Sequence, residues 1–138
     1  MLDTLQFELV SPARILLSEA VGMAVVPGVE GHFGILPHHM PLLSSLRPGV
    51  VSIHLQLNSK ASKKFFVDGG FAEVNSEGCI LLVDEAIPIE DLTSDFIAQR
   101  QNAAQEQLES ASSDEDKSAA EFSLAVAEAM ARALAEDS

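Results

Sequence analysis

Three of the four histidines of the chain stand among glycines and prolines in the stretch GVEGHFGILPHHMPLL, residues 28–43. Residues of these types could cradle a phosphate, bind a metal ion, or shape a rigid surface that docks on another protein. A phosphate loop needs closely spaced glycines that lead into a helix N-terminus. This stretch lacks the G-x-G-x-x-G order, and neither G-K-[ST] nor a helical pattern follows it. The phosphate interpretation is therefore rejected.

A metal site is not favoured either. His38 and His39 are adjacent, so in an extended segment their side chains point to opposite sides. His32 is six residues away, and no cysteine or carboxylate stands at ligand spacing. We expect surface or hydrogen-bonded histidines and no bound metal.

Nucleophilic and acid–base catalysis also find little support. The chain has no G-x-S-x-G motif, and its one cysteine, Cys79, lies inside the strand-like run CILLV, where a small apolar filler is expected. The acidic pairs Asp84-Glu85 and Glu90-Asp91 are typical of strand ends and helix starts. We predict a binding or mechanical module that has no catalytic residue and no cofactor.

Charge narrows the class of partner. The formal net charge is −13, which argues against nucleic acid and against an anionic lipid surface. No apolar run approaches the roughly 18 residues of a membrane span, and we expect no export signal or transit peptide. A single cysteine suits a reducing cytoplasm. Residues 1–88 carry nine acidic and five basic residues, and residues 89–138 carry twelve and three. We therefore predict two domains, 1–88 and 89–138.

Residues 1–88 predict β-structure. LQFELV alternates apolar and polar residues with a period of two. Further runs rich in Val, Ile, Leu and Phe are separated by Gly, Pro and Asn turn signals, and they cover residues 13–18, 20–26, 50–57, 63–69 and 79–84. Short strands at this spacing predict an antiparallel β-sandwich or flattened barrel. A hairpin is expected between the runs at 50–57 and 63–69, with Lys60, Lys63 and Lys64 at its tip.

Residues 89–138 predict an α-helical hairpin, because no Gly or Pro occurs from Asp91 to Ser138. We expect helices at about 91–109, capped by Asp91, and about 118–136, opened by a capping box at Ser118. Their apolar stripes are predicted as Leu92, Phe96, Ala103, Ala104 and Leu108, and as Phe122, Val126, Met130 and Ala133. Alanine contributes little burial energy, so the hairpin is expected to be a weakly held arm; the alternative is an arm that stays fixed against the β domain.

The stretch VVPGVEGHFGILPHHMPLLSSLRPGVV resembles a segment of the epsilon subunit of bacterial and chloroplast F-type ATP synthases. The family pattern G-x-E-G-x-x-G-I-x-P-x-H-x-P-L-x-x-x-x-x-P-G is matched at Gly28, Glu30, Gly31, Gly34, Ile35, Pro37, His39, Pro41, Leu42, Pro48 and Gly49. FFVDGGFAEVNSEGCILLVDEAI is similar to the second hallmark of the family. The resemblance covers essentially the whole chain.

This resemblance implies a ten-stranded sandwich of two five-stranded sheets, followed by two helices. It implies a rotor subunit of the central stalk that binds the gamma subunit and the c-ring, touches the alpha and beta subunits at most transiently, and helps to couple proton flow to ATP synthesis. Its location would be peripheral, at the cytoplasmic face of the bacterial inner membrane, without insertion into lipid; the mitochondrial equivalent fits less well. The loop expected to face the c-ring consists of Gly28, Glu30, Gly31, His32, Gly34, His38 and His39.

The sequence departs from the family at three places. His32 stands where relatives often have an acidic residue, so charge pairing with the c-ring is weakened. Some relatives bind ATP through I/L-D-x-x-R-A, and here Thr93, Phe96 and Ile97 replace its Asp, Arg and Ala, so no nucleotide site is expected. The helices of many relatives carry basic residues that inhibit rotation, whereas residues 89–138 have a net charge of −9. An inhibitory role is therefore doubtful. The alternative function is a non-catalytic β-sandwich adaptor with a helical oligomerisation arm.

Overall fold

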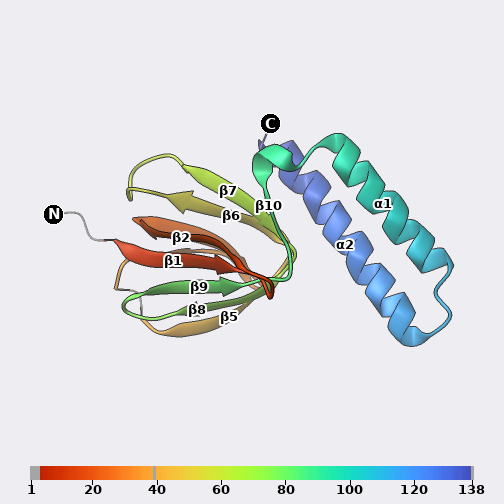
Figure 1. Ribbon diagram of the computed structural model, residues 1–138, viewed down its shortest axis with the longest axis horizontal. Helices are drawn as coiled ribbons and strands as arrows, with labels where there is room; N and C mark the ends of the chain where they lie inside the picture. Colours follow the sequence, from red (N-terminus) through yellow and green to blue (C-terminus); the bar gives the residue numbers. More distant parts are fainter. Residues whose placement is uncertain (1–3, 39, 138) are drawn as a thin grey trace. The chain divides into compact units, whose positions relative to one another are not determined.

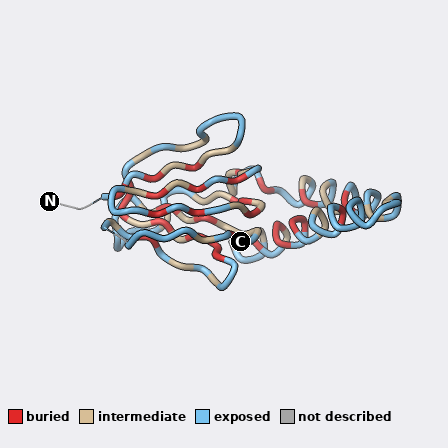
Figure 2. Tube along the Cα trace, turned by 90° about the horizontal axis from the view of Figure 1, so that it is seen from below, coloured by how far each residue is buried: buried red, intermediate tan, exposed pale blue. Residues whose placement is uncertain are grey.

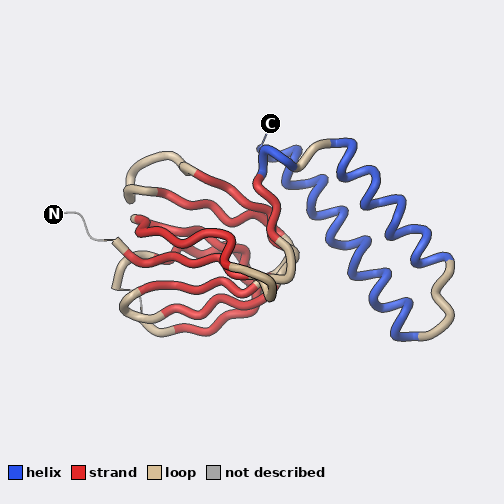
Figure 3. The backbone as a smooth tube through the Cα atoms, viewed as in Figure 1, coloured by secondary structure: helices blue, strands red, loops and turns tan. Residues whose placement is uncertain are grey.

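The computed structural model describes residues 4–38 and 40–137, and the chain divides into two compact units, Met1–Pro88 and Ile89–Ser138. The first, called the β unit below, holds the strands, and the second, the helical unit, holds the helices (Figure 3). The described part of the β unit contains ten strands: β1 (Leu5–Val10), β2 (Ile15–Val21), β3 (Met23–Gly28), β4 (Gly31–Ile35), β5 (Leu42–Leu46), β6 (Gly49–His54), β7 (Lys63–Val67), β8 (Gly70–Val74), β9 (Gly78–Leu82) and β10 (Ala86–Pro88).

The strands form two five-stranded layers (Figure 1). One layer has the order β10-β7-β6-β3-β4 and the other β5-β8-β9-β1-β2. A single residue pair, Gly28 with Leu46, links β3 to β5 and makes the layers one nearly closed sheet. This architecture confirms the predicted sandwich or flattened barrel. One pairing departs from the antiparallel prediction, because β1 lies parallel to β9, a strand about seventy residues later in the chain.

The core of the β unit follows from the period-two patterns. Leu5, Phe7 and Leu9 of β1 are all buried between the layers, as their alternation predicted. Buried residues alternate with less buried ones along β1, β6, β8 and β9 (Figure 2). The other layer contributes Val26, Ile35, Val51, Ile53 and Val67 to the same cluster.

The helical unit consists of a short 3₁₀ helix (Ile89–Asp91), α1 (Ser94–Glu109) and α2 (Asp114–Asp137). Both predicted helix starts are wrong. Thr93 caps α1 in place of Asp91, because its Oγ1 accepts a hydrogen bond of 3.1 Å from the Phe96 amide while Asp91 lies in the 3₁₀ turn. Helix α2 begins four residues before Ser118, where the Ser113 side chain accepts a 3.0 Å bond from the Asp116 amide.

Helices α1 and α2 pack against each other. Most of the predicted stripes are buried or half-buried, but Phe122 is 53% exposed and Ala103 is exposed. Alanines such as Ala120 and Ala127 are buried instead, and their small side chains allow close packing while Phe122 stays in solvent. No helix in the described part of the chain is long and apolar enough to cross a membrane.

Candidate docking surfaces

The stretch predicted to form one loop facing the c-ring is not a single loop. Its middle, Gly31–Ile35, is strand β4, which pairs with β3 from Gly31 opposite Gly28 to Ile35 opposite Ala24. The predicted set is therefore divided along a strand about 13 Å long. Gly28, Glu30, Gly31 and His32 lie at one end, Gly34 lies within the strand, and His38 lies in the turn that follows it. His39 is outside the described residues.

The first end is a rigid hairpin tip, defined here as residues 28–32. Val29 and Glu30 form a two-residue turn between β3 and β4, and Gly31 follows with φ 137°, a conformation that strongly favours glycine. Two backbone hydrogen bonds hold the tip to the next layer: the Val29 amide donates to the Ser45 carbonyl at 3.1 Å, and the Arg47 amide to the Pro27 carbonyl at 2.9 Å. The tip is thus a fixed projection.

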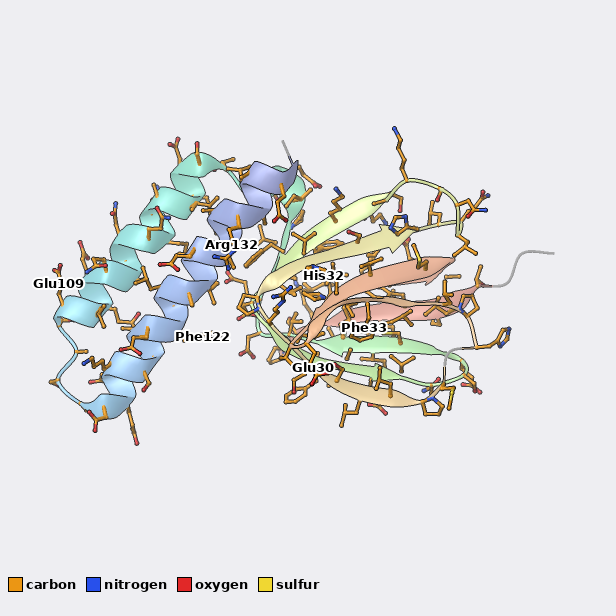
Figure 4. All side chains as sticks on the ribbon, turned by 180° about the vertical axis from the view of Figure 1, so that it is seen from behind. Glu30, His32, Phe33, Glu109, Phe122 and Arg132 are labelled. Carbon is orange, nitrogen blue, oxygen red and sulfur yellow. The ribbon has the colours of Figure 1, made fainter. Side chains whose placement is uncertain are left out.

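Three polar side chains give the tip its charge pattern. Glu30 and His32 are exposed (Figure 4), and an Arg47 guanidinium nitrogen lies 3.4 Å from Nδ1 of His32. Arginine only donates, so Nδ1 of His32 is the acceptor in this contact. The tip therefore presents the anionic carboxylate of Glu30. The cationic guanidinium of Arg47 lies against the tip through its contact with His32.

A shallow groove of about 410 Å³ lies beside the tip. It separates the tip from β5 and is lined mainly by apolar side chains and backbone, from Gly28, Val29, Glu30, Gly31, Phe33, Leu42, Leu43, Ser44 and Ser45. Val29 is 57% exposed and Leu43 is 70% exposed. Such a groove suits an apolar side chain from a docking partner.

A second apolar surface was not predicted from the sequence. The strand registers place Phe71, Leu82, Val10 and Ile15 side by side across β8, β9, β1 and β2. Phe71, Leu82 and Ile15 are about half exposed, so these four residues form an apolar row on the outer face of their layer. The available signal was weak: the runs GFAEV and CILLV carry apolar residues at both parities, which indicates burial or contact on both faces.

The cysteine and the residues at the positions of the ATP motif have structural roles. Cys79 is buried, and burial raises the pKa of its thiol to about 12, so it stays protonated at neutral pH. No cluster of three or more His, Cys, Asp or Glu side chains that could hold a metal ion occurs among the described residues. At the positions of the ATP motif, Thr93 caps α1, Ile97 is buried, and the Phe96 ring lies 5.1 Å from the Arg100 guanidinium carbon.

Comparisons with known proteins agree with this architecture. The family model "ATP synthase, Delta/Epsilon chain, beta-sandwich domain" matches residues 4–89. The chain is 50% identical to the "ATP synthase epsilon chain" of Paramagnetospirillum magneticum over 135 residues, which cover 98% of this chain and 100% of the relative.

Two solved structures share the fold. One is a chain of the Euglena gracilis mitochondrial ATP synthase (OSCP/F1/c-ring in rotational state 1), with a TM-score of 0.76 and 23% identity, covering 95% of this chain and 81% of that one. The other belongs to the central stalk/c-ring of the Tetrahymena thermophila mitochondrial ATP synthase, with a TM-score of 0.71 and 16% identity, covering 94% and 96%. The family model and the full-length identity decide the assignment: this chain belongs to the ATP synthase delta/epsilon chain family.

Proposed function

We infer that this chain is the epsilon subunit of an F-type ATP synthase. It is a non-catalytic subunit of the central stalk, with the gamma subunit and the c-ring as partners, and it helps to couple proton translocation to ATP synthesis. The observation that carries this conclusion is 50% identity to an epsilon chain along the full length of both proteins. No specific observation favours the alternative of a free adaptor with an oligomerisation arm.

The two units divide the work as separate domains. In our proposal the β unit makes the docking contacts and the helical unit is an arm. The hairpin tip at residues 28–32 contacts the polar loops of the c-ring, and the groove beside it receives an apolar side chain. The turn at Val29 and Glu30, the exposed Glu30 carboxylate and the contact of the Arg47 guanidinium with His32 support this choice. His38 lies beyond the far end of β4 and belongs to a different surface.

Binding of the purified c-ring by the full-length chain tests the tip. Exposed polar contacts contribute about 0–1 kcal/mol each, so Glu30→Ala/His32→Ala is expected to weaken binding about three- to tenfold. The control His38→Ala keeps wild-type affinity. Equal loss in both variants, or loss only in the control, would contradict the assignment of the tip.

The apolar row of Phe71, Leu82, Val10 and Ile15 is the proposed face for the gamma subunit. Its exposed side chains and their continuity across four strands support this role, because a contiguous apolar surface on a soluble domain usually marks a protein contact. Co-purification with the gamma subunit is expected to fail for Phe71→Ser/Leu82→Ser and to persist for Phe122→Ser, a matched exposed phenylalanine of α2. Retention of gamma by the first variant would assign its contact elsewhere.

We further propose that the helical unit is a poor inhibitor of ATP hydrolysis. It has a net charge of −9, and each close like-charge pair with an acidic segment of a catalytic subunit costs roughly 1 kcal/mol even in water. Any contact with the alpha and beta subunits is then transient. ATP hydrolysis by the soluble complex is expected to be similar with the full-length chain and with residues 1–88. A large rise on truncation would contradict this.

The proposed location is peripheral, at the cytoplasmic face of a bacterial inner membrane, where the chain is held by its protein partners. It binds no nucleic acid and inserts into no lipid. The bacterial relative and the net charge of −13 support this placement. Removal of the c-ring and gamma subunit should release the chain from membranes, whereas retention on protein-free lipid would contradict the proposal.

A further inference from the structure

Acidic and basic residues are unevenly distributed along the sequence, and the proposed docking sites do not explain this distribution. Residues 31–67 contain no Asp or Glu, although the chain has 21, and they include four of its eight basic residues and all four histidines. Three of those bases, Lys60, Lys63 and Lys64, lie within five residues at the β6–β7 connection. The fourth base, Arg47, contacts His32 at the hairpin tip, so the three lysines are the basic group at this connection. Lysines gathered in an acidic chain point to a partner of negative charge.

The β6–β7 connection, residues 55–62, is a built structure and is called the lysine–leucine loop here. Ser59 closes it: its Oγ donates to the Gln56 carbonyl at 2.8 Å, and its amide donates to the same carbonyl at 3.1 Å. His54 Nδ1 lies 2.9 Å from the Ser59 carbonyl oxygen and donates to it. The Ser62 amide bonds the Ile53 carbonyl at 2.7 Å and closes the base of the loop.

Apolar side chains of this closed loop are exposed to solvent. Leu55 is 51% exposed and Leu57 54% exposed, although the sequence pattern placed both in a strand. The β4–β5 connection adds Leu36 at 41% and Met40 at 79% exposure. Strands β4 and β6 both pair with β3, so these two connections begin roughly 10 Å apart. The exposed apolar side chains of both connections therefore lie at the same end of the sandwich.

The charged groups around this end come from several strands. Lys63 Nζ is 3.2 Å from Glu19 Oε2 of β2, so one lysine charge is already balanced within the protein. Glu77, in the turn between β8 and β9, lies at the same end of the other layer. Lys60 is exposed on the loop itself, close in sequence to both of its leucines. The basic character of the loop therefore depends chiefly on Lys60.

The strand directions place this loop at the end of the sandwich opposite the hairpin tip. Strand β3 runs from Met23, opposite His54 at the base of the loop, to Gly28 at the tip. If the tip faces the c-ring, as the proposed function states, the loop faces away from the membrane. The net charge of −13 also disfavours an anionic lipid surface as its occupant.

We propose that the lysine–leucine loop docks on an acidic protein segment of the soluble part of the ATP synthase, with Leu55 and Leu57 in apolar contact and Lys60 paired with a carboxylate. This proposal rests on the proposed function for its orientation. It adds a contact at the end of the β unit remote from the c-ring.

The test is a titration of the soluble complex depleted of this subunit with full-length chains. Leu55→Ser/Leu57→Ser is expected to weaken binding at least tenfold. Lys60→Glu should weaken it about threefold at low salt and not at 1 M salt, where the Debye length falls to about 3 Å. Lys117→Glu, on α2, is the matched charge-reversal control and keeps wild-type affinity. Thermal unfolding of each variant shows that the fold is intact.

Unchanged binding of Leu55→Ser/Leu57→Ser overturns the proposal. So does flotation of the wild type, but not of this variant, with phosphatidylglycerol vesicles, which would make the loop a lipid contact. Self-association that the same substitutions abolish in sedimentation would also overturn it. Affinity of Leu55→Ser/Leu57→Ser for the c-ring is a separate readout. It stays at the wild-type level if only the loop proposal fails. A change in that affinity would mean that the proposed arrangement of the two ends is wrong.

Discussion

The β unit and the helical unit bury their chains in different ways. The β unit surrounds large side chains such as Phe7 and Leu9 on both sides with two layers of strands. The helical unit buries mainly alanines along α2, with Leu92 and Met130 its largest fully buried side chains. Burying a Phe or Leu contributes roughly 1.5–3 kcal/mol and an alanine much less. Fixed docking surfaces therefore belong on the β unit, and the helical unit is the part better suited to rearrange.

Substitution of one phenylalanine in each unit measures this difference most strongly. Phe7→Ala opens a cavity in the core of the β unit and is expected to lower its free energy of unfolding by about 3–5 kcal/mol. Phe122→Ala removes a side chain that is 53% exposed and should change stability by less than about 0.5 kcal/mol. Urea unfolding followed by circular dichroism checks both. Similar losses would mean that Phe122 is part of a core.

Two glycines of the β unit compare a tightly packed position with one that has open space around it. Gly31 has φ 137° and open space where a Cβ would stand, whereas Gly70 has φ 115° and a Cβ there would clash with the Leu82 carbonyl oxygen. Gly31→Ala is expected to cost about 1–3 kcal/mol from backbone strain alone. Gly70→Ala should cost about 1–3 kcal/mol more because the strands must separate. Thermal unfolding of the two variants provides the comparison, and equal losses would show that β8 and β9 yield easily.

The smallest expected effect concerns Asp68, at the β7–β8 turn. Burial raises the pKa of its carboxyl above 3.8, opposed by the hydrogen bond of 3.1 Å that Oδ1 accepts from the Glu85 amide. The folded protein therefore holds this proton more tightly than the unfolded chain does, so the contribution to stability is complete below pH 3.8 and is lost as pH rises through the folded pKa. Asp68→Asn should remove that decline.

Melting temperatures of wild type and Asp68→Asn, measured from about pH 3.5 to about pH 6.5 around the ordinary carboxyl range, isolate this group, because the remaining carboxylates are common to both proteins. The wild type should lose stability relative to the variant as the pH rises. A constant difference across the range would show that Asp68 titrates alike in the folded and unfolded chain.

The sequence predicted the β unit where burial follows a local period. Alternation in LQFELV identified β1 and its three buried residues, because each inward side chain repeats every second position. The predicted runs did not include β4, β5, β8 or β10; the sequence of β4, GHFGI, contains two glycines and only short apolar segments. For that reason the hairpin tip and His38 were joined into one loop. The helix starts were missed because Ser113 and Thr93 cap through single side-chain bonds that compete with equally suitable neighbours.

The candidate surfaces were predictable to unequal degrees. The family pattern includes Glu30 and Gly31, and His32 is a departure from the residue that relatives often have, but the contact between His32 and Arg47 joins residues fifteen apart. The apolar row depends on the register of four strands, one of them paired in parallel. Such a surface emerges only when the strand order is known, because no single segment of the sequence contains it.

Binding by the separate units tests the central claim that the β unit carries the docking surfaces. Residues 1–88 and the full-length chain are titrated against a complex of the gamma subunit and c-ring that lacks this subunit. We expect residues 1–88 to bind within about threefold of the full-length chain, and residues 89–138 not to bind. Binding that requires residues 89–138, or that is retained by them alone, would contradict the account.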